Sequence, residues 1–134
     1  MKKKLLILVA LGIIVSGVIA YTQFNKPHRN IAEEASSFLL TADVLFDAFE
    51  ENEAAANKKY LDKVITVFGE IVDVDTNQDN KDVVTLEAEN AMMGGVICTL
   101  KETSVFAIGD EVALKCRCTG FLDDVILVDC TLEK

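Results

Sequence analysis

The sequence predicts a mainly β protein, in which a five-stranded barrel is preceded by an α-helix and by an N-terminal transmembrane helix. Three observations lead to this prediction. An almost unbroken apolar segment opens the chain, and a short stretch near residue 45 has apolar residues at helical spacing. After Lys63 the apolar residues recur with the period of two that marks β-strands. At 134 residues the chain is long enough for one domain and an appendage.

The N-terminal segment combines a positive start with a long apolar run. Lys2, Lys3 and Lys4 precede Leu5–Tyr21, which only two glycines and one serine interrupt. The run exceeds the roughly 7–15 residues of a signal-peptide core and reaches the about 17–25 residues of a spanning helix. We therefore predict a membrane anchor over residues 1–21, with a signal segment cleaved after Ala20 as the alternative. In both cases the lysines stay in the cytoplasm and the rest of the chain is exported.

The charge of the exported part argues against one class of partner. The chain has 22 acidic and 13 basic side chains. Because Lys2–Lys4 contribute +3 to the net charge of −9, the remainder carries −12. A body this acidic repels the phosphates of nucleic acids and of anionic lipid headgroups. We expect contact with the membrane through the N-terminal helix, and the charge disfavours a nucleic-acid partner.

The domain is predicted to begin with a helix. Residues 22–40 are mostly polar and are expected to form a linker, so that residues 41–134 make up the helix and the barrel. Thr41 is suited to cap a helix over Ala42–Asn57, and Asp43 in its first turn complements the helix dipole. Leu45, Phe46 and Phe49 recur at helical spacing, and such a stripe normally docks on its own domain.

Five strands follow the helix. They are predicted over Val64–Asp75, Asp82–Glu89, Val96–Leu100, Glu111–Phe121 and Val125–Glu133. In the first strand the apolar positions change parity between Gly69 and Val72, which indicates a bulge or a strong bend. Five strands with a bent first strand, and with a connector between the third and the fourth, describe an OB-fold barrel. A five-stranded meander or an SH3-like barrel is the alternative.

All four cysteines fall on the apolar side of the predicted strands. The strand order of an OB-fold, 1-2-3-5-4-1, places the strand of Cys130 between the strand of Cys98 and the strand of Cys116 and Cys118. A turn centred on Asp123 sets Cys116 opposite Cys130, and a register shift of two sets Cys118 there. A disulfide is plausible outside the cytoplasm, but spacing alone leaves both pairings and free buried thiols open. No metal site is predicted, because Cys116-x-Cys118 lacks the spacing that zinc sites use.

Two acidic clusters contain residue types that metal sites or acid–base catalysis use. Asp75, Asn77 and Asp79 in the first hairpin make a weak calcium candidate, but a bidentate Glu is missing at the twelfth position, where Leu86 stands. We expect a solvated turn. Carboxylate pairs such as Asp123-Asp124 have no partner base, phosphate cradle or oxyanion donor in the sequence. We therefore predict a protein without catalytic activity and without a cofactor.

Two surfaces are candidates for binding. The turn Met92-Met93-Gly94-Gly95 places two methionines at a tip, and methionine adapts to varied partners. Lys115 and Arg117 form the only basic pair predicted on a strand, facing outward. The sequence thus favours an exported, membrane-anchored binding or interaction module with a protein partner.

Three segments resemble a known family. The run Tyr60–Ile71 (YLDKVITVFGEI), the motif Gly109–Val112 (GDEV) and the motif Cys118–Phe121 (CTGF) look like the tRNA_anti-like OB-fold family. These are small bacterial proteins with an N-terminal membrane segment and one OB domain.

The resemblance adds three expectations. It implies a single-pass protein of the bacterial inner (cytoplasmic) membrane, with its N-terminus inside and the OB domain extracytoplasmic. It implies nucleic-acid or oligosaccharide binding as the alternative function. It also favours Cys118–Cys130 as the disulfide, with Cys116–Cys130 as the other pairing.

Overall fold

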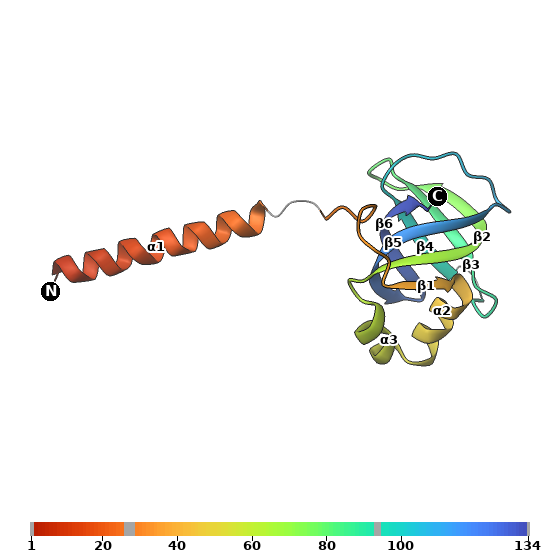
Figure 1. Ribbon diagram of the computed structural model, residues 1–134, viewed down its shortest axis with the longest axis horizontal. Helices are drawn as coiled ribbons and strands as arrows, with labels where there is room; N and C mark the ends of the chain where they lie inside the picture. Colours follow the sequence, from red (N-terminus) through yellow and green to blue (C-terminus); the bar gives the residue numbers. More distant parts are fainter. Residues whose placement is uncertain (1, 26–28, 93–94, 134) are drawn as a thin grey trace.

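A computed structural model describes residues 2–25, 29–92 and 95–133 of the chain. Helix α1 (Lys2–Phe24) extends three residues beyond the predicted anchor. Its 23 residues correspond to a length of about 34 Å, enough for a bilayer core of about 30 Å. The stretch Leu6–Phe24 has a mean hydropathy of 2.1, and none of it is buried in the structure. Figure 1 shows this helix (red) and the β-domain as its two main features.

The β-domain is a closed barrel of five strands, as predicted. The barrel strands are β2 (Val64–Thr76), β3 (Asp82–Glu87), β4 (Gly95–Leu100), β5 (Glu111–Leu122) and β6 (Asp124–Leu132). They follow the order β2-β3-β4-β6-β5, and pairing of β2 with β5 closes the ring. This is the predicted OB order, and every strand end lies within two residues of its predicted position.

An additional strand, β1 (Phe38–Thr41), lies in the stretch that was predicted as a linker. It runs parallel to β2, with Phe38 opposite Ile65. Upstream of it Ile31 is fully buried, and the Ser36 hydroxyl lies 2.6 Å from the hydroxyl of the buried Thr66. The predicted linker is thus corrected, because its second half is part of the folded domain.

Strand β2 is bent in the middle. Its first half, Val64–Glu70, pairs with β5, and its second half, Ile71–Thr76, pairs with β3. The register shifts between Ile71 and Asp73, so the predicted bulge is confirmed. The bulge increases the local twist, which lets one strand serve two sides of the barrel.

Two helices, and not the single predicted one, cover one end of the barrel. Helix α2 (Ala42–Glu51) begins at Thr41, whose hydroxyl accepts a hydrogen bond from the amide of Val44, so the predicted cap is confirmed. The helix stops because Asn52 adopts an extended conformation (φ −157°). The Asn52 carboxamide then caps α3 (Glu53–Tyr60) by accepting from the amide of Ala55 at 3.0 Å.

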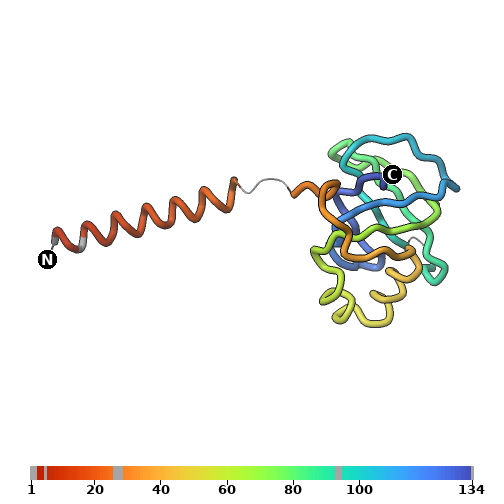
Figure 2. The backbone as a smooth tube through the Cα atoms, in the orientation of Figure 1, coloured from red at the N-terminus to blue at the C-terminus, as the bar shows by residue number. Residues whose placement is uncertain are grey.

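Aromatic side chains join the helices to the barrel end. Phe49 of α2 stacks on Phe121 of β5 with ring centroids 5.8 Å apart, and Phe46 meets the same ring edge-on at 5.9 Å. Such pairs add about 0.5–1.5 kcal/mol beyond their buried area. Figure 2 shows the two helices (yellow to olive) together beneath the barrel. The stripe of Leu45, Phe46 and Phe49 docks on its own domain, as predicted.

Substitution of Gly95, the first residue of β4, tests how closely β3 and β4 approach each other at that point. Gly95 has φ +147°, and a Cβ atom there would lie 2.4 Å from the carbonyl oxygen of Leu86. We expect Gly95→Ala to lower the free energy of unfolding by about 1–3 kcal/mol, because a backbone atom blocks the added methyl group. Urea unfolding of the full chain in detergent, followed by far-UV circular dichroism, measures the change.

Gly109→Ala is the matched control for Gly95→Ala. Gly109 also has a positive φ of +94°, but a Cβ atom there would have nothing closer than a Glu70 carboxylate oxygen at 4.0 Å. Its loss should be smaller, since only backbone strain acts. Equal losses in the free energy of unfolding for the two variants would contradict the close approach of the Leu86 carbonyl oxygen to Gly95.

Candidate binding pocket and cysteine cluster

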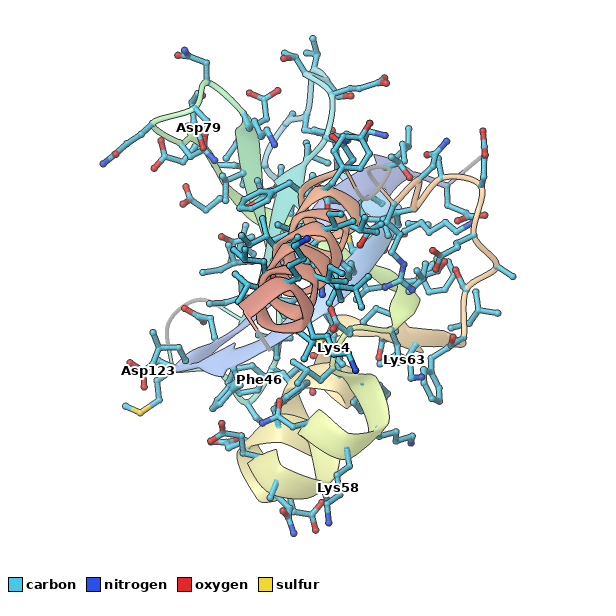
Figure 3. All side chains as sticks on the ribbon, turned by 90° about the vertical axis from the view of Figure 1, so that its left-hand side faces the viewer. Lys4, Phe46, Lys58, Lys63, Asp79 and Asp123 are labelled. Atoms are coloured by element: carbon cyan, nitrogen blue, oxygen red, sulfur yellow. A yellow bond between two sulfur atoms is a disulfide. The ribbon has the colours of Figure 1, made fainter. Side chains whose placement is uncertain are left out.

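A pocket of about 680 Å³ lies where helix α2 meets the β5–β6 hairpin and the loop before β4. This volume is within the range of roughly 300–1,000 Å³ that small-ligand sites occupy. Its lining residues are Phe46, Glu50, Asn90, Met92, Phe121 and Asp123. Figure 3 shows Phe46 and Asp123 at the same end of the barrel, with Asp79 at the opposite end.

The floor of the pocket is aromatic and is packed against both the helix and the hairpin. Phe46 is 4% exposed, and the half-buried Phe121 packs against it and against Phe49 behind it. Because Phe121 also belongs to the paired end of β5, opposite Val125, the floor is fixed by both the helix and the hairpin.

Helix α2 also holds the loop that carries Met92. The amide of Glu89 donates to a carboxylate oxygen of Asp43 at 2.8 Å. The carboxamide of Asn90 donates to Asp47, also at 2.8 Å. Met92 itself is fully exposed. The exposed thioether therefore stands beside the aromatic floor on an anchored loop.

The charge around this pocket is negative. Glu50 and Asp123 are exposed, and no basic residue is among the residues described as lining the pocket. Helix α2 carries four acidic residues and no basic one. Asp43 and Asp47 accept hydrogen bonds from the loop, whereas Glu50 and Asp123 face solvent. The pocket therefore offers an apolar floor with an acidic rim, which suits an apolar group flanked by positive charge.

The methionine turn is only partly described by the structure. Met92 lies at the rim of the pocket, and Gly95 is the buried first residue of β4. Met93 and Gly94 lie outside the described residues. The sequence does not link Met92 with Phe46 and Phe121, because both phenylalanines have the spacing of core residues. The position of Phe121 next to a hairpin turn was the one available signal.

The predicted basic pair does not form an open basic surface. Arg117 makes ion pairs with Asp62 at 3.1 Å and with Asp129 at 3.4 Å. Lys115 donates to the carbonyl oxygen of Ala32 at 3.3 Å. Both side chains thus bind groups of their own chain, and neither lines the pocket of Phe46 and Phe121.

The cysteines are all buried, as predicted, but the favoured pairing is corrected. The structure joins Cys116 to Cys130, with an S–S distance of 2.12 Å and a Cα–Cα distance of 4.2 Å. Cys118 lies opposite Leu127 and remains a thiol. The alternative pairing, Cys116–Cys130, is therefore the one present, in place of Cys118–Cys130.

Two register shifts between β5 and β6 explain this pairing. One lies between Cys118 and Gly120 and the other between Lys115 and Arg117, and because they offset each other Cys116 lies opposite Cys130. Regular alternation in β6 would place Ile126 and Val128 on the same side as Cys130, but Val125 and Leu127 are the buried residues. Asp129 has a positive φ of 55°, and the register shifts between Lys115 and Arg117. The extra residue turns Cys130 inward at the level of Cys116, so the parity of the strand changes between Leu127 and Cys130.

A third thiol lies beside the disulfide. The sulfur atoms of Cys98, Cys116 and Cys130 are all within 4.8 Å of one another. Among the described residues this is the one group of ligand side chains close enough to share a metal ion. Burial raises the pKa of the Cys98 thiol far above its ordinary range, so the thiol is protonated at neutral pH.

The weak calcium candidate forms a hairpin turn. The Asn77 carboxamide oxygen accepts from the amides of Asp79 and Lys81, at 2.9 and 3.0 Å. Asp75 accepts from the amide of Thr76 at 2.7 Å. These side-chain oxygen atoms accept hydrogen bonds from backbone amides and so stabilise the turn, as expected for a solvated turn.

Two comparisons with known proteins bear on the fold. The model of the family described as tRNA_anti-like matches residues 1–132, which confirms the resemblance. Among solved structures, the fold is similar to that of a candidate nucleic acid-binding lipoprotein from Klebsiella pneumoniae subsp. pneumoniae. The TM-score is 0.52 at 20% sequence identity, over 70% of this chain and 91% of that chain. At this identity the likeness shows the fold alone. No curated protein matches the sequence.

The disulfide can be tested by peptide mapping. Trypsin cuts after Lys115 and Arg117, and an Asp-directed protease cuts before Asp123 and Asp129, so Cys116, Cys118 and Cys130 fall on separate peptides. After alkylation in denaturant without reductant, we expect the Cys116 peptide to be joined to the Cys130 peptide, with Cys98 and Cys118 alkylated. A link from Cys118 to Cys130 would contradict the register of β5 and β6.

Proposed function

The chain belongs to the tRNA_anti-like family, and from that premise we propose that it is a membrane-anchored OB-fold module that binds a protein partner. The binding surface is the pocket of Phe46 and Phe121 with its acidic rim. The partner contributes an apolar side chain flanked by lysine or arginine. The module acts by contact and not by catalysis.

The N-terminal helix supports the anchoring part of the proposal. Its stretch Leu6–Phe24 is apolar and unburied, so it has no protein core to occupy. Lys2, Lys3 and Lys4 precede it, and positive residues remain on the cytoplasmic side. The barrel then lies on the outer side of the bacterial cytoplasmic membrane.

The pocket supports the binding part of the proposal, and its charge favours a cationic partner. An aromatic floor releases free energy when an apolar side chain covers it, at about 25 cal/mol per Å² of buried apolar surface. The exposed carboxylates of Glu50 and Asp123 stand at its edge, and a body that carries −12 without Lys2–Lys4 attracts cationic partners over a longer range. A basic and apolar peptide segment meets both requirements.

The rival function is nucleic-acid binding, which the name of the Klebsiella protein suggests. OB-folds that bind single strands combine a positive groove with exposed aromatic side chains. In this chain the outward residues of β3 include Thr85 and Glu87, and Arg117 is held between Asp62 and Asp129. The local charge therefore favours the peptide.

A charge-neutralised pocket tests the partner chemistry. The probe is a fluorescent octapeptide of alternating lysine and leucine, titrated into the full chain in detergent micelles. We expect the double variant Glu50→Gln/Asp123→Asn to weaken binding about five- to tenfold, because each exposed ion pair is worth up to about 1 kcal/mol. Fluorescence anisotropy at low and high salt measures the affinity.

Glu87→Gln/Glu102→Gln is the matched control. It removes the same two charges at exposed positions that do not line the pocket. Its affinity should stay within about twofold of the unmodified chain. Equal weakening by the two double variants would show that the net charge of the chain attracts the peptide, and not the carboxylates of Glu50 and Asp123 in particular. Absence of peptide binding, with tight binding of a single-stranded oligonucleotide, would favour the rival.

The topology has its own test. We expect the full chain to keep residues 1–20 and to expose its tagged C-terminus to protease once the outer side of the inner membrane is accessible. Intact-protein mass and protease digestion of whole and opened cells measure the two properties. A product that is shorter by 20 residues would show that the N-terminal segment is a cleaved signal and not an anchor. Protection until the cytoplasm is opened would reverse the orientation.

A further inference from the structure

Three neighbouring strands each bring one cysteine to the same point in the barrel. Cys98 lies on β4, Cys130 on β6 and Cys116 on β5, and β6 runs between the other two strands. The three side chains are at most 1% exposed. The convergence is a result of the OB strand order together with the inward turn of Cys130 at the β6 bulge.

The spacing of these sulfur atoms is close to that of a metal site. Cys98 Sγ lies within 4.8 Å of both bonded sulfur atoms. When a disulfide is reduced, its sulfur atoms move apart to van der Waals contact, roughly 3.5–4 Å. Three thiolates on one zinc ion, with Zn–S bonds of about 2.3 Å, lie roughly 3.8 Å from one another. After reduction, the three sulfur atoms therefore lie within about 1 Å of the spacing that a thiolate-bound ion requires.

A cleft adjoins the strands that carry the cluster. It has a volume of about 260 Å³, and its lining includes Cys130, Leu100 and Glu102. Because Cys130 is only 1% exposed, a reductant or a metal ion reaches its sulfur atom when the neighbouring ends of β4 and β6 open locally. Cys118 is not in the sulfur cluster and does not line the cleft, although it is equally buried.

We propose that the reduced chain binds one thiophilic metal ion, such as Zn²⁺, through Cys98, Cys116 and Cys130, and that the Cys116–Cys130 disulfide closes this site. Thiolate sulfur is the ligand that zinc and copper(I) prefer. This inference is independent of the pocket of Phe46 and Phe121, which lies at the end of the barrel covered by helix α2.

The chemistry balances in two steps. A dithiol reductant supplies two electrons and two protons, which break the S–S bond and leave two thiols, while the dithiol becomes a disulfide. Zn²⁺ then replaces the protons of the three thiols, and three S–Zn bonds form as three protons leave to solvent. The bound ion offsets two of the three thiolate charges, which makes deprotonation in an apolar interior feasible.

The test uses the full chain in detergent, reduced anaerobically and then freed of reductant. Zinc is added in competition with a chromophoric chelator. We expect one zinc ion per reduced chain and none per oxidised chain. Cys98→Ala should lower the affinity about tenfold or more, because it removes one of three ligands. Cys118→Ala, the matched control, should leave the affinity unchanged.

Several results would overturn the proposal. They are zinc binding by the oxidised chain, no zinc binding by the reduced chain, and equal effects of Cys98→Ala and Cys118→Ala. A second measurement covers the case in which Cys98→Ala does not fold. In the unmodified reduced chain, zinc should slow alkylation of Cys98, Cys116 and Cys130 in mild denaturant and leave Cys118 unaffected, whereas equal protection of all four thiols, or of none, would refute the site.

Discussion

Closure of the barrel by the pairing of β2 with β5 is the constraint on which the rest of the structure depends. Seven residues of β2, from Val64 to Glu70, pair with β5, and the bulge after Ile71 then carries the strand over to β3. A closed ring leaves no edge between barrel strands and surrounds a narrow interior. Small apolar side chains fill such an interior, and cysteine is one of them. The same closure sets β6 between β4 and β5, so it also brings Cys98, Cys116 and Cys130 together.

Closure leaves the two ends of the barrel to be covered, and the helical cover at one end creates the pocket of Phe46 and Phe121. Helix α2 turns its apolar stripe toward the barrel, where Phe49 and Phe46 meet Phe121. Its opposite side is acidic, because an amphipathic helix places polar residues toward solvent. Where the helix meets the β5–β6 hairpin, the edge of the aromatic cluster remains accessible beside Glu50 and Asp123. In the proposed function, packing and recognition therefore share one set of phenylalanines.

Strand positions, the Thr41 cap and the inward cysteines could be predicted because each depends on local periodicity or on one side chain. The missed features depend on tertiary context. Strand β1 is four residues long, too short for a period of two to stand out, and it is held by its pairing with β2. Asn52 ends one helix and caps the next, and either role fits the sequence. The positive φ of Asp129 marks one of two register shifts between β5 and β6. These offset each other and leave Cys116, and not Cys118, opposite Cys130. The pocket was found only in part, since its aromatic floor comes from two segments 75 residues apart.

The most direct measurement of the central claim is a methyl NMR titration of the full chain with ¹³C-labelled methionine. Met92 is fully exposed at the rim of the pocket, and Met92→Leu assigns its resonance. We expect a lysine–leucine peptide to shift the Met92 resonance saturably and a single-stranded oligonucleotide to leave it in place. If the oligonucleotide shifts the methionine resonances and the peptide does not, the acidic-rimmed pocket is not the binding surface of this protein.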